Sequence, residues 1–289
     1  MTENTKNPSK KKKILKIAGP VFAIIALYFI YDSVFFISTD NAQVQANTVI
    51  LTSRVSGFVT KVNVVEGQSV KQGEVLVEID SKDYQSKTEQ SENELGSLSA
   101  RARDAELNYN RILKLFEEGA VSLQQKDSAY ANYQELSRKQ NALKNQLEIS
   151  KSGLSDTQIR APSNGIIARR SAEAGMLANP GTPLLGFVSS ETRWVIANFK
   201  ETDLSRLKTG QKVSITVDAV SGKSYKGEIE TFYPATGAIF ALLPPDNATG
   251  NFTKVVQRVP TRIKLLDLTA SDISDLKAGL SAIAEVRVR

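Results

Sequence analysis

The stretch Ser56-Gly57-Phe58-Val59 aligns with Asn164-Gly165-Ile166-Ile167, which lies 108 positions later. At the same offset, and without a gap, further identical residues recur: Gly67 with Gly175, Gly73 with Gly181, and Leu76 with Leu184. Glycine marks the tight turns of a small β-unit, and identity at one fixed offset indicates a repeated unit. We therefore expect one β-module divided into two halves, residues 52–80 and 157–189.

The segment between the halves, residues 81–156, has a helical pattern. One seam steps alternately by four and three residues through Tyr84, Thr88, Ser91, Leu95, Leu98, Ala102, Ala105, Tyr109, Ile112 and Phe116. A second seam follows the same rule through Ala129, Tyr133, Leu136, Gln140, Leu143, Leu147, Ser150 and Leu154. We expect an antiparallel coiled-coil hairpin with arms of roughly 50 Å. Gly119 is expected to cap the first helix and Ser122 the second.

Three residues at the expected hairpin tip are candidate contact residues. Arg111, Leu115 and Ser122 have the spacing R-x3-L-x6-S. Arginine donates a fork of hydrogen bonds, leucine fills an apolar notch, and serine reaches backbone groups at close range. The alternative is a charged turn with an ordinary helix cap.

Composition excludes several classes of function. The 289-residue chain contains neither cysteine nor histidine, which removes disulfides, most zinc sites and Ser-His or Cys-His catalysis. The net charge is +6, but residues 1–16 hold six lysines against one acid, so the rest of the chain is nearly neutral. A basic tail on a neutral body indicates a membrane surface and not a nucleic-acid partner.

An apolar stretch follows the basic tail. Residues 17–37 are long enough as a helix to cross a bilayer, with Tyr28 and Tyr31 suited to the interface. Because the lysines precede the stretch, the positive-inside rule places residues 1–16 in the cytoplasm and the rest across the membrane. A cleaved signal peptide is the alternative.

The remaining segments have strand patterns. Residues 38–51 are expected to form a linker or strand that joins the last part of the chain, and residues 190–289 a small antiparallel β-barrel with alternating strands. The divided β-module resembles the lipoyl/biotinyl fold. A carrier of biotin or lipoate is an alternative function, but Lys82 and Lys87 begin a helix and do not lie on a tight β-turn. No cofactor or metal is expected.

Nearly the whole chain resembles the HlyD-type membrane fusion (periplasmic adaptor) family, and within it the EmrA-like multidrug adaptors. The residues that carry the resemblance are Thr39-Asp40-Asn41-Ala42, Arg54-Val55-Ser56-Gly57, Ile159-Arg160-Ala161-Pro162, Ala197-Asn198-Phe199-Lys200-Glu201-Thr202, Leu242 to Gly250, and Asn251-Phe252-Thr253-Lys254-Val255-Val256-Gln257-Arg258-Val259-Pro260. One departure is that the segment of residues 81–156 is short for the EmrA-like group.

This resemblance implies a mixed α and β, elongated and modular protein without enzymatic activity. It implies a single-pass protein of the inner membrane of a Gram-negative bacterium, with its bulk in the periplasm. The implied partners are a transporter of the major facilitator superfamily, a TolC-like outer-membrane channel touched by Arg111, Leu115 and Ser122, and further copies of the chain, as a hexamer. An adaptor for an ABC-type exporter of peptide or protein is the alternative.

Overall fold

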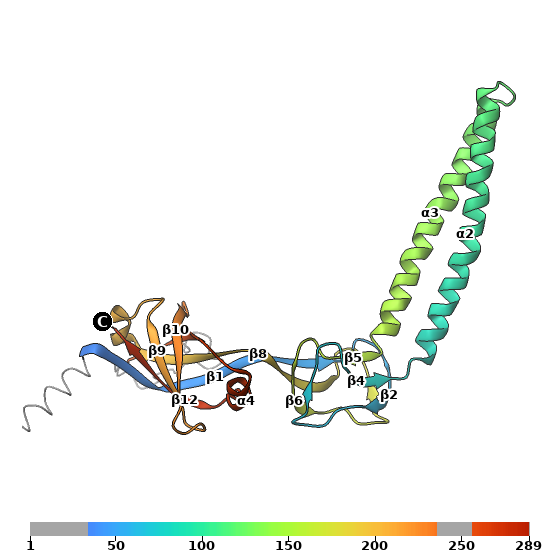
Figure 1. Ribbon diagram of the computed structural model, residues 1–289. Coiled ribbons are helices and arrows are strands. Elements are labelled where there is room, and N and C mark those ends of the chain that lie inside the picture. Colours follow the sequence, from blue (N-terminus) through green and yellow to red (C-terminus); the bar gives the residue numbers. More distant parts are fainter. Residues whose placement is uncertain (1–33, 236–255, 289) are drawn as a thin grey trace, which may run out of the picture. The chain divides into compact units, whose positions relative to one another are not determined.

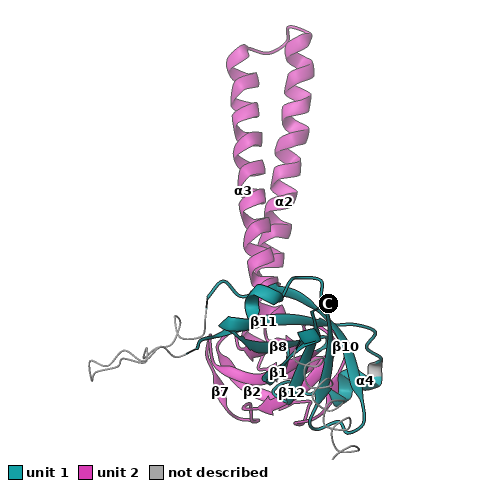
Figure 2. Ribbon diagram, turned by 90° about the vertical axis from the view of Figure 1, so that its left-hand side faces the viewer, with its two compact units in different colours: residues 1–47, 190–289 teal, residues 48–189 magenta. Residues whose placement is uncertain are grey.

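The computed structural model of the chain describes residues 34–235 and 256–288 (Figure 1). The predicted basic tail and most of the predicted membrane span lie outside these residues. Among the described residues, no helix combines the length and the apolar character needed to cross a bilayer. The chain divides into two compact units, residues 48–189 and residues 1–47 with 190–289 (Figure 2).

The end of the predicted span requires a correction. Phe36 and Ile37 belong to strand β1 (Phe36–Thr52) and not to a helix. Ile37 and Thr39 are buried and Ser38 between them is exposed, which is the alternation of a strand with one face on a core. A run of four apolar residues does not distinguish these two structures, because it fits either the end of a membrane helix or the start of a barrel strand.

The two halves of the β-module interlock within residues 48–189. We call the β-part of this unit, residues 48–80 and 157–189, the clasp. Strand β2 (Gly57–Val62) pairs with β7 (Leu177–Ala178), and β3 (Ser69–Val70) pairs with β6 (Gly165–Arg170). Strand β4 (Val75–Ile79) lies between β2 and β5 (Gln158–Arg160). Each half therefore completes its sheets with strands of the other half.

The repeat at offset 108 is confirmed in hydrogen bonding. The amide of Val59 donates to the carbonyl of Met176 at 2.8 Å, and the amide of the equivalent Ile167 donates to the carbonyl of Gln68 at 3.0 Å. The clasp thus has an internal pseudo-twofold relation in which residue i and residue i+108 exchange roles.

Glycine is required in both halves of this repeat for the same reasons. Gly67 and Gly175 have φ of 82° and 87°, a left-handed conformation that glycine adopts without strain. Gly57 and Gly165 allow close packing, since an added Cβ would lie 2.7 Å from Ile79 and 2.3 Å from the equivalent Phe187. The recurring glycines of the sequence are therefore geometric requirements of the repeated unit.

The helical segment forms the predicted hairpin. Helix α2 (Lys82–Glu117) and helix α3 (Leu123–Ser155) pack along their length. Every residue of the two predicted seams is buried or half-buried. The seam near the clasp is polar and small, where Ser91 and Ser150 hydrogen-bond at 3.2 Å. The coiled-coil prediction is confirmed.

The second unit is a β-barrel. Its strands are antiparallel in the order β1, β12 (Ser281–Arg287), β9 (Lys212–Val217), β10 (Ser224–Phe232), β11 (Arg258–Leu265) and β8 (Pro183–Lys200). The ring closes between β8 and β1, where Thr39 Oγ1 donates to the carbonyl of Asn198 at 2.9 Å and Asn198 Nδ2 donates to Asn41 Oδ1 at 3.0 Å. Inward-facing apolar residues such as Phe199, Ile215 and Ile263 fill the interior.

A short helix, α4 (Ala270–Asp275), lies at one end of the barrel (Figure 1). It carries Asp272, which is buried and binds Lys223 Nζ and both the hydroxyl and the amide of Thr269. The hydrogen bond from Lys223, together with those from Thr269, holds the pKa of Asp272 at about 2. Helix α4 is thereby fixed to the start of β10.

Candidate functional site

The hairpin tip has a defined backbone conformation. Residues 118–122 connect the helices, and Gly119 has φ of 75° just after the last turn of α2. The amide of Ala120 donates to the carbonyl of Leu115 at 2.8 Å, which satisfies one of the carbonyls left free at the helix end. The predicted helix cap at Gly119 is confirmed, and the turn presents its side chains on an ordered backbone.

Ser122 begins the second helix as predicted. Its hydroxyl oxygen accepts from the amide of Gln125 at 3.3 Å, and Gln125 Oε1 accepts from the amide of Ser122 at 2.9 Å. This reciprocal capping box gives Ser122 a structural role, while its side chain remains exposed. The serine is therefore an ordinary cap and an accessible hydroxyl at once.

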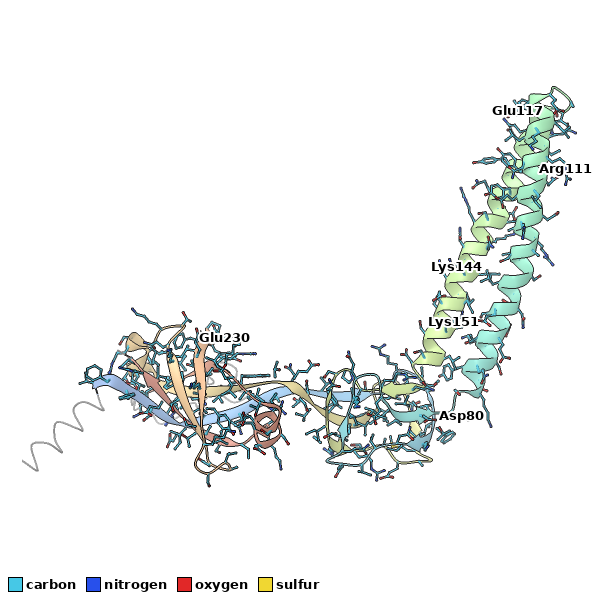
Figure 3. The ribbon with its side chains drawn as sticks, in the orientation of Figure 1. Asp80, Arg111, Glu117, Lys144, Lys151 and Glu230 are labelled. Atoms are coloured by element: carbon cyan, nitrogen blue, oxygen red, sulfur yellow. The ribbon has the colours of Figure 1, made fainter. Side chains whose placement is uncertain are left out.

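Arg111 lies near the end of α2 (Figure 3), and Leu115 follows it one helical turn later. Arg111 is exposed, so its guanidinium can reach a partner, whereas Leu115 is half-buried against the hairpin. Arg111 precedes the last residue of α2 by about 9 Å of helix rise. The structure thus places all three predicted residues at the tip, but it gives Leu115 less freedom to enter a partner than the sequence suggests.

The part of the hairpin near the tip is stiffened by aromatic packing. Tyr109 stacks on Tyr133 with ring centroids 5.9 Å apart, and it meets Tyr130 at 5.2 Å. Lys126 Nζ lies 5.0 Å from the centre of the Phe116 ring. These contacts join the two helices where the backbone turn is close, and they hold the tip on a rigid support.

Sequence reasoning missed two exposed side chains near the tip. Leu123 is 55% exposed and Tyr130 is 46% exposed. Neither Leu123, which follows the cap Ser122, nor Tyr130 belongs to the predicted seam, so the seam pattern itself indicated that both side chains lie outside the helix contact. They add an apolar surface to the polar one formed by Arg111 and Ser122.

The side chains described at the tip offer hydrogen-bonding and apolar groups. In the described part of the chain, no group of three acidic residues could hold a metal ion. Lys82 is the first residue of α2, and Lys87 lies further along the same helix, so neither occupies the β-turn that a carrier lysine requires. The chemistry available at the tip is hydrogen bonding and apolar contact.

Comparisons with known proteins identify the family. The family described as RND MFP, barrel-sandwich hybrid domain, matches residues 47–188, and the one described as CusB-like, beta-barrel domain, matches residues 192–239. The colistin resistance protein EmrA of Acinetobacter baumannii is 31% identical over 338 residues, covering 95% of both chains. The multidrug export protein EmrA of Haemophilus influenzae is 32% identical over 338 residues, covering 99% of this chain and 86% of that protein.

A solved structure agrees on the fold alone. The MacA-MexA chimeric protein, which contains the Pseudomonas aeruginosa MexA α-hairpin domain, has a TM-score of 0.61 at 23% identity, covering 88% of this chain and 81% of that one. Both EmrA alignments extend over 338 residues against 289 in this chain, so these relatives contain residues that have no counterpart here. That the hairpin is shorter than in the EmrA-like relatives stays a prediction, because the alignments do not show where in those relatives the extra residues lie. The chain belongs to the membrane fusion protein (periplasmic adaptor) family, in its EmrA-like group.

Proposed function

We propose that the protein is the periplasmic adaptor subunit of a tripartite multidrug efflux pump, linking an inner-membrane transporter of the major facilitator superfamily to a TolC-like outer-membrane channel. As a membrane fusion protein it is a linker and not an enzyme. The observation that carries the proposal is the hairpin. Two capped helices of 36 and 33 residues end in an exposed tip and start from a clasp of interlocked strands.

The physical task of such an adaptor is to hold its contact surfaces at a fixed separation. A helix of 36 residues extends about 54 Å. The continuous seam and the aromatic contacts near the tip oppose bending of the hairpin, because bending would separate packed side chains. The tip residues Arg111, Leu115 and Ser122 are proposed to contact the channel, together with the exposed Leu123.

The other parts of the proposal concern assembly and anchoring. The part of the apolar stretch that precedes β1 is proposed to anchor the chain in the inner membrane, with residues 1–16 in the cytoplasm. Copies of the chain are proposed to form a ring, as a hexamer. The names of the relatives, colistin resistance protein and multidrug export protein, support efflux, whereas the matching family is named for RND and not for the major facilitator superfamily. The transporter class therefore has to be tested directly.

The first test is deletion of the gene in cells that lack other pumps, followed by susceptibility to a panel of toxic compounds. We expect sensitisation that the wild-type gene reverses. Arg111→Asp should fail to reverse it at normal protein level, because it places an acid where a guanidinium donor is needed. Arg101→Asp is the matched control, since Arg101 is exposed on the same helix and lies ten positions further from the tip. Equal complementation by both variants would argue against the tip contact.

The second test identifies the transporter. The tagged full chain is crosslinked in cells and purified, and the co-purifying membrane proteins are identified by mass spectrometry. A carrier of the major facilitator superfamily supports the proposal. An ATPase would instead favour the alternative, an adaptor of an ABC-type exporter. Loss of the channel crosslink in Arg111→Asp, but not in Arg101→Asp, would link the tip to the channel.

A further inference from the structure

One end of the barrel has a distinct composition. Strand registers bring its parts together: Phe36 pairs with Arg287, Glu228 with Lys212, and Lys200 with Arg258. We define the rim as residues 34–36, 200–212, 228–235, 256–258 and 287–288. Figure 1 shows the start of β1 and the C-terminal residues at this end and α4 at the opposite end of the barrel.

Exposed apolar side chains concentrate on the rim. Val34 is 43% exposed, Tyr233 40% and Val256 48%. Among the described residues of the barrel unit, the only other exposed large apolar side chain is Ile283 on the barrel wall. Three of the four exposed large apolar side chains of the described barrel unit thus lie at one end, which makes this end the candidate contact surface of the barrel.

Charge is also divided between the two ends. The rim holds six basic residues against four acidic ones; the basic residues are Lys200, Arg206, Lys208, Lys212, Arg258 and Arg287, and all six are exposed. One of the four acids, Glu230, is paired with Arg262 at 2.7 Å. The opposite end, residues 190–193, 218–223 and 268–280, holds three basic residues against four acidic ones. The barrel is therefore polarised, with the positive end at the rim.

The rim is also the place where the chain arrives from its apolar N-terminal stretch. Val34 lies near the end of that stretch, and Arg206 of the rim donates a hydrogen bond to the carbonyl of Val34. If the part of the apolar stretch that precedes β1 anchors the chain, as the proposed function requires, the rim is the part of the barrel closest along the chain to the membrane.

We propose that the rim lies against the lipid surface and binds anionic headgroups. Tyrosine and valine can enter the headgroup boundary, while the basic residues are attracted to negative lipids. Each basic residue near such a surface strengthens the interaction about fivefold at low salt. This inference rests on the proposed membrane anchor and adds the position of the barrel and its lipid preference.

The test uses the full chain in lipid nanodiscs. Because the chain has no cysteine, Thr209→Cys on the rim and Lys277→Cys at the opposite end each give one labelling site. Both positions are exposed. With an environment-sensitive fluorophore, we expect spin-labelled lipids to quench the label at 209 in discs containing phosphatidylglycerol, more weakly in phosphatidylcholine discs, and not to quench the label at 277.

A charge variant distinguishes electrostatic attraction between the rim and the lipid headgroups from mere proximity of the rim to the membrane. Lys212→Glu should reduce the quenching at 209 in anionic discs about twofold or more, and 1 M salt should do the same by screening. Lys277→Glu is the matched control, since Lys277 is exposed at the opposite end of the barrel. Equal effects of the two variants would overturn the role of the rim charges.

The remaining outcomes also decide the proposal. Equal quenching at 209 and 277, or none at 209, in discs that carry the chain would overturn the rim contact and leave the membrane anchor intact. A blue-shifted label at 209 that the lipids do not quench would mean that a protein surface covers the rim. Failure of the full chain to enter the discs would overturn the anchor as well as this inference.

Discussion

The two halves of the clasp follow one backbone pattern but lead to different parts of the protein. In the first half, Ile79 ends β4 and the chain continues into the hairpin. In the second half the equivalent Phe187 lies within β8, which continues into the barrel. The halves differ in the same way where the chain enters them. Thr157 enters the second half from the hairpin, and the equivalent Val49 enters the first half from the barrel part of β1.

The halves also differ in how tightly they pack at equivalent positions. The Cβ that is missing at Gly57 would meet a side-chain methyl of Ile79, whereas at Gly165 it would meet the Phe187 ring and the carbonyl of Val188 at 2.5 Å. The backbone symmetry therefore tolerates unequal side chains. The two halves share their backbone geometry, but they differ in how far the atoms beside the equivalent glycines can move aside.

The largest expected effect falls on the shared core. Leu76 and Leu184 are equivalent and both fully buried. We expect Leu76→Ala and Leu184→Ala to destabilise the clasp by about 2–5 kcal/mol each, and by similar amounts, because each removes the same group from the same core. Hydrogen exchange of clasp amides measures this change, with barrel amides as the internal control. A large effect of only one variant would show that the pseudo-symmetry does not extend to energetics.

The next effect should separate the halves. Gly165→Ala is expected to cost about 3 kcal/mol, because the carbonyl of Val188 belongs to a paired strand and cannot move aside. Gly57→Ala is expected to cost about 1 kcal/mol, since the Ile79 methyl can shift and the nearest backbone atom, the carbonyl of Asp80, is 3.6 Å away. The same exchange measurement tests the order of the two variants, and the reverse order would contradict the packing argument.

Small effects of equal size are expected at the two turns. No atom lies within 4 Å of a Cβ added at Gly67 or at Gly175, so only the left-handed backbone opposes a substitution there. Gly67→Ala and Gly175→Ala should each cost about 1 kcal/mol. Asparagine at either position should cost less, because its side chain tolerates this conformation. If alanine were harmless at one turn only, the two turns would differ in conformation.

Much of this architecture could be predicted because it depends on local rules. The offset of 108 residues, the two seams and the caps at Gly119 and Ser122 each follow from backbone geometry that particular residues specify. The pairing of the two halves could also be predicted, since a β-unit that is divided by an insertion has to complete its own sheets.

Other features depend on tertiary contacts that the sequence does not reveal. The half-burial of Leu115 and the start of β1 at Phe36 are decided by what packs against those residues. Helix α4 was missed, although the spacing of Thr269 and Asp272 is a capping-box signal. The charge division of the barrel was hidden because its residues come from segments far apart in the sequence.

The smallest effect on stability is expected from removing the hairpin. The amide of Ile79 donates to the carbonyl of Thr157 at 2.8 Å, and Glu78 pairs with Gln158, so the chain leaves and re-enters the clasp at adjacent positions of one antiparallel pair. Replacement of residues 81–155 by Asn-Gly should therefore join Asp80 to Asp156 through a two-residue β-turn. The replacement also removes the hydrogen bond that Tyr84 Oη donates to the carbonyl of Ser56 at 2.9 Å, which is worth about 1 kcal/mol.

This excision tests whether interlocked strands alone hold the halves together. We expect clasp amides to keep their exchange protection within about 1 kcal/mol, while the variant loses all ability to restore compound resistance. Tyr84→Phe in the full chain is the control, because it removes the same hydrogen bond and keeps the hairpin. If excision unfolded the clasp and Tyr84→Phe did not, the hairpin would be part of the folding unit. The strand pairs of β2 with β7 and β3 with β6 would then be insufficient to hold the two halves together.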